Sequence, residues 1–82
     1  MATRNVKVGD VIICRASWGA DKPKRERLSG IERTKEEGSK NGDEVDSVKW
    51  IDGKWEFPFI CDMENGHWAY SYQIKPEYIA PN

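Results

Sequence analysis

The chain has 82 residues, and its 13 basic and 14 acidic side chains give a formal net charge of −1. A chain of this length forms one domain, and its charge balance gives no general attraction to nucleic acid or to an anionic membrane. Hydrophobic residues make up only 38%, but they include 4 Trp, 3 Tyr and 2 Phe, whose large side chains can build a small core. We therefore expect a single folded domain over residues 1–82.

The sequence predicts a cytoplasmic protein without membrane attachment. No apolar run approaches the roughly 20 residues that a spanning helix needs, and residues 1–10 lack the apolar centre of a signal peptide. Secreted domains this small more often carry a disulfide framework of about four or more cysteines, whereas this chain has 2. Cys14 and Cys61 both fall on the apolar side of predicted strands, which favours buried free thiols, with a disulfide as the alternative.

The first predicted strand follows a short extended piece at residues 6–8 and a turn at Gly9-Asp10. Its inner face is expected to carry the side chains that share one parity, namely Ile12, Cys14, Ala16 and Trp18.

Residues 19–46 are of a different character. Their only apolar members are Ala20, Leu28, Ile31 and Val45. The first half of the segment is basic and the second half acidic. Ordering this segment costs about 1–2 kcal/mol of backbone entropy per residue. Because so few of its side chains can be buried, little stabilisation offsets that cost. We therefore predict a long charged insert that is mobile or only loosely paired.

Residues 48–74 carry the clearest pattern in the chain. Asp52-Gly53 and Asn65-Gly66 are typical of two-residue hairpin turns, and such turns place Trp50 opposite Trp55 and Cys61 opposite Tyr70. Both registers gather apolar side chains on one face of a three-stranded meander: Val48, Trp50, Trp55, Phe57, Phe59, Cys61, Met63, Trp68, Tyr70, Tyr72 and Ile74. Pro58 cannot donate to a strand ladder, so it marks a bend in the middle strand that lets the sheet curl.

The order of these elements resembles that of SH3-like barrels. The resemblance is carried by Val8-Gly9-Asp10-Val11-Ile12, by the two hairpins, and by Ile74-Lys75-Pro76-Glu77-Tyr78-Ile79. It implies an all-β, small antiparallel barrel with a 3₁₀ turn that ends in Tyr78, whose ring packs near one end of the barrel. Tyr78 and Trp55 match by position two groove residues of the peptide-binding members. The Ala-Leu-Tyr-Asp-Tyr segment of those members is missing, and Lys75 stands where their Pro-x-x-Tyr turn has its proline.

Catalytic and metal-binding patterns are absent from the sequence. The only histidine, His67, stands beside the Asn65-Gly66 turn, and with Cys14 and Cys61 it makes three zinc ligands without the paired spacing of a zinc site. No phosphate-binding glycine loop or Ser-His-Asp arrangement is visible. We predict a protein that is not an enzyme and carries no cofactor or metal.

Binding is the remaining class of function. The aromatic side chains outnumber what so small a core encloses, so we predict a module that recognises another protein through exposed aromatics and the charged insert. The predicted partner-binding residues are Trp18, Lys22, Lys24, Arg25, Arg27, Trp55, Trp68 and Tyr78. The alternative is a nucleic-acid-binding barrel that contacts phosphates with the basic half of the insert. The acidic half of the insert opposes phosphate approach and favours the protein partner.

Overall fold

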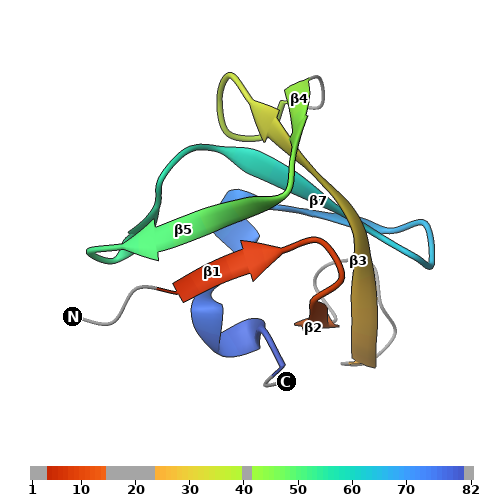
Figure 1. Cartoon of the computed structure of the whole chain (residues 1–82). Coiled ribbons are helices and arrows are strands. Elements are labelled where there is room, and N and C mark those ends of the chain that lie inside the picture. The colour runs from red at the N-terminus through yellow and green to blue at the C-terminus, as the bar shows by residue number, and fades with distance from the viewer. Residues whose placement is uncertain (1–3, 15–23, 40–41, 81–82) are drawn as a thin grey trace.

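The computed structural model describes residues 4–14, 24–39 and 42–80 (Figure 1). Its strands are β1 (Arg4–Lys7), β2 (Val11–Cys14), β3 (Lys24–Thr34), β4 (Gly42–Val45), β5 (Ser47–Ile51), β6 (Lys54–Trp55), β7 (Phe59–Met63) and β8 (Trp68–Tyr70). Two 3₁₀ turns follow, η2 (Ser71–Gln73) and η3 (Pro76–Tyr78). Every strand pairing is antiparallel, so the prediction of an all-β antiparallel fold is confirmed.

The strands form two sheets. One has the order β1-β5-β6, and the other has the order β2-β3-β7-β8 with β4 also paired to β3. The inner faces share one core, which consists of Val6, Ile12, Leu28, Ile31, Val48, Phe59, Cys61, Met63, Ala69, Ile74 and Ile79. The chain end closes on the second sheet, because Ile79 bridges Ile12 and the Ala80 amide donates to the Val11 carbonyl at 2.8 Å.

The prediction that residues 19–46 form a mobile or only loosely paired insert is wrong for the part of this segment that the structure describes. Its described residues contain β3, the longest strand, which pairs with β2, β4 and β7 and runs from beside β2 to beside β4 (Figure 1). Leu28 and Ile31 are each 1% exposed, although they stand three positions apart. A register shift between Leu28 and Gly30 explains this, because a bulge returns the second half of the strand to the core side.

The first predicted hairpin is confirmed and the second is wrong by one residue. Trp50 pairs with Trp55, and Asp52 and Gly53 take φ values of 54° and 82°, as a type I′ turn requires. In the second hairpin, Cys61 pairs with Ala69 instead of Tyr70.

A three-residue loop at positions 64–66 causes the shift. The Met63 amide donates to the His67 carbonyl at 2.8 Å, and Gly66 takes the positive φ of 89° that ends such a loop. As a result Ala69 faces the core, while Trp68 is 44% exposed. Tyr72 follows the end of β8, in η2, and is 62% exposed.

The remaining expectations on the fold have mixed outcomes. Pro58 stands between β6 and β7, which belong to different sheets, and the predicted bend is therefore confirmed. The turn that ends at Tyr78 is present as η3, and Tyr78 is half-buried there. Cys61 is a buried free thiol, as predicted, whereas the side chain of Cys14 lies outside the description. Within the described ranges, no helix is both long and apolar enough to span a membrane.

Candidate functional site

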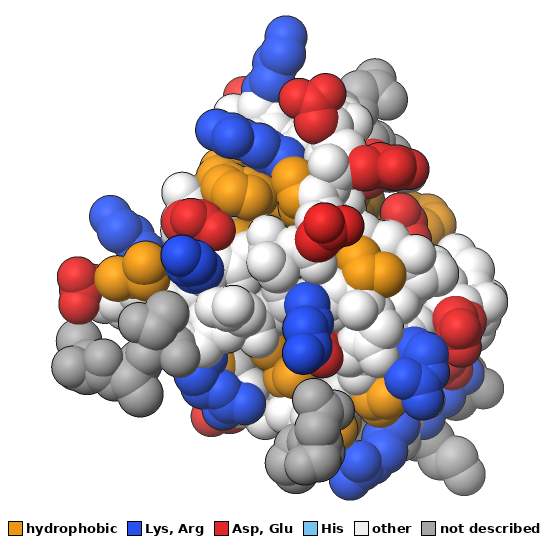
Figure 2. Space-filling view, viewed as in Figure 1, with side chains coloured by type: hydrophobic (Ala, Val, Ile, Leu, Met, Phe, Trp, Pro, Cys, Tyr) orange, Lys and Arg blue, Asp and Glu red, His pale blue; other side chains and the backbone are white. Residues whose placement is uncertain are grey.

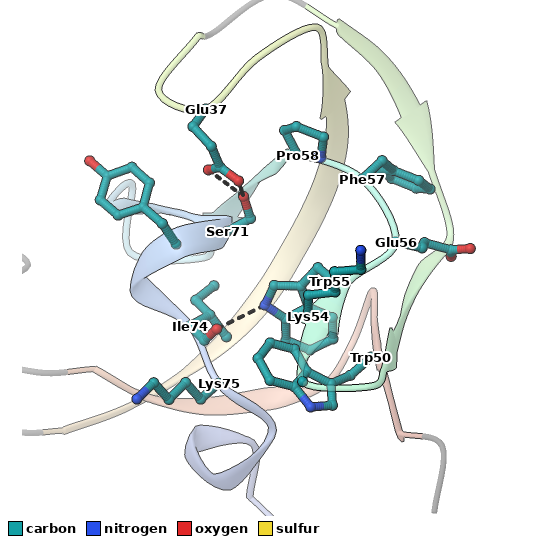
Figure 3. Close-up of a pocket in the computed structure, with 12 residues that line it drawn as sticks. Glu37, Trp50, Lys54, Trp55, Glu56, Phe57, Pro58, Ser71, Ile74 and Lys75 are labelled. Atoms are coloured by element: carbon teal, nitrogen blue, oxygen red, sulfur yellow. Dashed lines mark hydrogen bonds between the residues drawn. The ribbon is translucent and has the colours of Figure 1, made fainter. Parts of the chain in front are cut away.

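An open groove with aromatic walls lies between the β5–β6 hairpin and the segment that follows β8 (Figure 3). We call it the aromatic groove, and its volume is about 440 Å³. Its apolar lining consists of Trp50, Trp55, Phe57, Pro58, Tyr72 and Ile74. Its charged lining consists of Glu37, Lys54, Glu56 and Lys75.

The hairpin places two tryptophans side by side on one wall. Trp50 and Trp55 are directly opposite in the β5–β6 register, and their rings meet edge to face with centroids 4.8 Å apart at 76°. Trp55 also contacts the core residue Phe59 edge to face at 5.3 Å. Its indole N–H donates to the Ile74 carbonyl across the groove at 2.8 Å, so Trp55 joins the two walls.

Tyr72 forms the most exposed part of the apolar lining. Its ring stacks on Tyr70 with centroids 5.6 Å apart and planes 12° apart. The stacking holds an aromatic side chain that is 62% exposed, which leaves one of its surfaces accessible at the groove.

Near Pro58 the groove is lined by Glu37 from the loop that follows β3. The Ser71 hydroxyl donates to the Glu37 carboxylate, with oxygen distances of 2.8 and 2.6 Å (Figure 3). The carbonyl of Glu36 accepts from the Thr34 hydroxyl at 2.9 Å and from the Ser39 hydroxyl at 2.9 Å. These bonds fix the position of Glu37 although its side chain is exposed.

A second hollow of about 350 Å³ adjoins the groove and shares Phe57 and Pro58 with it. The Arg33 guanidinium lies over the Phe57 ring there, 4.7 Å from the centroid. The two hollows therefore lie on either side of Phe57 and Pro58, one at the β5–β6 hairpin and the other at the β3–β4 pair.

The predicted partner-binding residues are not brought together. Trp55 lines the aromatic groove, whereas Trp68 pairs with Asp62 on the β8 edge of the other sheet. Tyr78 lies in η3, which contacts β1 and β2. Trp18 and Lys22 lie outside the described residues.

The predicted basic residues Lys24, Arg25 and Arg27 occupy the β2 end of β3 and are exposed. An extended strand advances about 3.3 Å per residue, so along β3 Lys24 lies up to about 33 Å and Arg27 up to about 23 Å from Thr34, which lines the second hollow. The Arg27 guanidinium donates to the Gly9 carbonyl at 2.8 Å, which directs it back onto its own fold. Elsewhere on the face shown in Figure 2, basic and acidic side chains are interspersed.

Sequence reasoning missed several residues of the groove. Trp50 was visible as the register partner of Trp55, and this pairing is the signal that identifies it. Tyr72 was assigned to the core face because the strand was expected to continue past Tyr70, whereas β8 ends there and η2 begins. Glu37 and Ile74 reach the groove from distant parts of the chain, and no local pattern marks them.

Burial raises the pKa of the Cys61 thiol well above its usual range, and the charges of Asp62 and Asp10 add to this effect. A neutral, enclosed thiol is a poor nucleophile, so Cys61 is part of the core and not of the site. Across residues 4–14, 24–39 and 42–80, no group of three or more His, Cys, Asp or Glu side chains is arranged to hold a metal ion.

Comparison with known proteins gives no relative from which a function can be transferred. No protein-family model matches the chain, and no curated protein or solved structure matches it significantly.

Proposed function

We propose that this chain is a non-enzymatic binding module that holds an extended segment of another protein in the aromatic groove. The observation that carries the proposal is the open groove with Trp50, Trp55 and Tyr72 on its walls. Tryptophan and tyrosine dominate the energetics of protein interfaces because they bury much area at a low entropy cost. The adjoining hollow at Phe57 and Pro58 lengthens this surface and suits an extended chain better than a compact ligand.

The side chains of the groove favour binding over catalysis. Ser71, the serine that lines it, is 2% exposed and donates its hydroxyl to Glu37, so it is not presented to a substrate. Covalent catalysis needs a nucleophile beside a base and open to the substrate. The hydrogen bond between Trp55 and Ile74 also fixes the groove before any ligand enters, which lowers the entropy cost of association.

We further propose that the two sheets are an open variant of the SH3-like barrel. The support is the element order, in which the Gly9-Asp10 turn precedes β2 and η3 ends in Tyr78 before Ile79. The bridge between Ile79 and Ile12 returns the chain end to the first strands. This assignment concerns architecture and does not identify the ligand.

Nucleic acid is the second candidate ligand, supported by the exposed Lys24, Arg25 and Arg27 at one end of β3. Phosphate contacts make affinity fall steeply as salt rises, whereas binding centred on aromatic residues changes little. This basic end lies at the β2 end of β3 and does not line the aromatic groove, so the exposed aromatic ring of Tyr72 and the basic side chains do not form one continuous surface among the described residues. The protein segment is therefore the better supported ligand.

The test is selection from a random dodecapeptide display library on the immobilised full chain. We expect enriched peptides whose affinity falls about tenfold in Tyr72→Ala, within the range for an aromatic hot spot. Ile51→Ala is the matched control, because Ile51 is 43% exposed but does not line the groove. A wild-type selection without enrichment, or peptides that bind Tyr72→Ala as tightly as wild type, would overturn the proposal.

A further inference from the structure

Strand β6 forms one edge of its sheet, and this edge lies at the aromatic groove. Every residue of the range 53–58 lines the groove. Successive side chains of an extended chain point to opposite faces, so a hollow over one face would meet only every second side chain. A hollow that meets each residue in turn follows the edge of the chain (Figure 3). The aromatic groove therefore runs along the side of β6 that β5 does not occupy.

The hydrogen-bond pattern of the sheet turns the backbone polar groups of Trp55 towards this edge. In an antiparallel pair, residues that exchange backbone hydrogen bonds alternate with residues whose N–H and C=O groups point away from the partner strand. The Glu56 amide donates to the Lys49 carbonyl at 3.0 Å. The neighbouring pair, Trp50 with Trp55, is therefore of the second kind.

The ladder between β1 and β5 gives the same result independently. The Val8 amide donates to the Asp46 carbonyl at 3.0 Å, so every second pair of this register exchanges hydrogen bonds, including Arg4 with Trp50. Trp50 thus directs its backbone groups to β1 and not to β6. Among the residues that the structure describes, the N–H and C=O groups of Trp55 have no backbone partner.

The Trp55 side chain leaves the space beside β6 open. Side chains stand roughly perpendicular to a sheet, whereas the N–H and C=O groups of a strand lie in its plane. The Trp55 ring contacts the core residue Phe59, so the ring and its bond to Ile74 lie on the core side of β6. A chain placed beside β6 in the plane of the sheet passes over this ring.

We infer that the segment bound in the aromatic groove adds to β6 as a further strand of the sheet β1-β5-β6, with main-chain hydrogen bonds to the N–H and C=O groups of Trp55. The inference rests on the proposed function and specifies how the segment is held. Main-chain bonds of this kind supply affinity, and every second ligand side chain faces the apolar lining and supplies specificity.

The edge of β6 is short, which favours a ligand with anchors of its own over a second copy of the chain. Pro58 has no N–H to offer, and the Asp52-Gly53 turn ends the strand on the other side. A second copy brings the same 2-residue strand and adds few bonds. A segment that also covers the apolar lining adds the burial that so short a ladder lacks.

The experiment replaces one backbone amide of the full chain by an ester. Chemical synthesis of the 82-residue chain places the ester between Lys54 and Trp55, which removes the Trp55 N–H and keeps every side chain. The control carries the ester between Arg4 and Asn5. Asn5 is exposed on β1, the other edge of the same sheet, and does not line the groove.

The two ester positions are matched in their backbone surroundings. Like Trp55, Asn5 stands in a pair that exchanges no hydrogen bonds, because its partner Lys49 is bonded on the β6 side. The carbonyl that precedes each ester, that of Lys54 or of Arg4, belongs to a hydrogen-bonded ladder pair, so the ester weakens one ladder acceptor in both chains.

The ligand is the consensus peptide that the random dodecapeptide library yields on the wild type. Its affinity for the three chains is titrated by fluorescence anisotropy. The Trp55 ester should weaken binding about threefold to tenfold, the effect of one hydrogen bond, and the Asn5 ester should leave it unchanged. Amide hydrogen exchange of the wild type is followed by NMR with the peptide and, without it, at two protein concentrations. The peptide should slow exchange of the Trp55 amide and not of the Asn5 amide.

Several results would overturn the inference. Wild-type affinity of the Trp55 ester, with unchanged exchange of the Trp55 amide in the complex, would remove it while leaving peptide binding intact. Equal losses in the two esters would show a general weakening of the sheet. Protection of the Trp55 amide that grows with protein concentration in the absence of peptide would assign the edge to a second copy. A wild-type selection without enrichment would remove the proposed function itself.

Discussion

Leu28→Ala tests whether β3 belongs to the core or is a charged addition to it. Leu28 is 1% exposed and belongs to the core cluster, opposite Met63 in the β3–β7 register. The substitution removes Cγ and both Cδ methyl groups, which at about 0.8 kcal/mol per buried carbon amounts to roughly 2.4 kcal/mol. The cavity left behind adds to this, so the expected loss of unfolding free energy is about 3–5 kcal/mol.

Such a loss is a large part of the total stability, since a domain of this size has only about 4–12 kcal/mol. The assay is urea unfolding followed by tryptophan fluorescence and far-ultraviolet circular dichroism, with coincidence of the two transitions as the test of two-state behaviour. Ser29→Ala is the control, because Ser29 is the exposed neighbour of Leu28. A loss below about 1 kcal/mol for Leu28→Ala would refute the assignment of β3 to the core.

Two further predictions concern single positions. Gly42→Ala should lower the free energy of unfolding by about 1–3 kcal/mol in urea, because a methyl group at Gly42 would overlap the Arg33 carbonyl. Asp43→Ala is the control, because Asp43 is exposed, and it should change this free energy little. Equal losses in the two variants would refute the prediction. The free energy of unfolding should fall as pH rises above 9.0, the ordinary pKa of a thiol, because the unfolded state releases the Cys61 proton while the native state retains it. Cys61→Ala should remove this pH-dependent component, which amounts to at most about 1.4 kcal/mol per pH unit. Wild-type and Cys61→Ala profiles that run parallel above pH 9.0 would contradict the prediction.

The first hairpin was predictable because its turn chemistry is local. Asp52 and Gly53 both take positive φ, and few dipeptides other than Asp-Gly or Asn-Gly do so readily. The second hairpin was not predictable at single-residue accuracy. Asn65-Gly66 is compatible both with a two-residue turn and with the end of a three-residue loop, and only the packing of Ala69 into the core decides between them.

Strand β3 was hidden by its composition and by its bulge. Most of its side chains are charged and face outward, and the register shift before Gly30 breaks the alternation that identifies a strand. Leu28 and Ile31 are both buried, but their spacing of three positions matches no regular strand pattern in the sequence. The groove could not be predicted from the sequence either, because Glu37 and Ile74 approach Trp55 only after the two sheets pack.

The bond between the Trp55 indole and the Ile74 carbonyl has a consequence for how the molecule opens. Strand β6 has 2 residues, stands at the end of the order β1-β5-β6 and pairs with β5 alone. The Trp55–Ile74 bond and the contact of Trp55 with Phe59 attach it to the rest of the fold. Short, edge-placed elements open at a lower free-energy cost than the rest of a fold. Loss of the Trp55–Ile74 bond would therefore release the tip and widen the groove in the same step. If the proposed segment binds between the walls, it would connect the two sheets, and its binding free energy would suppress this partial unfolding before it affects the global transition.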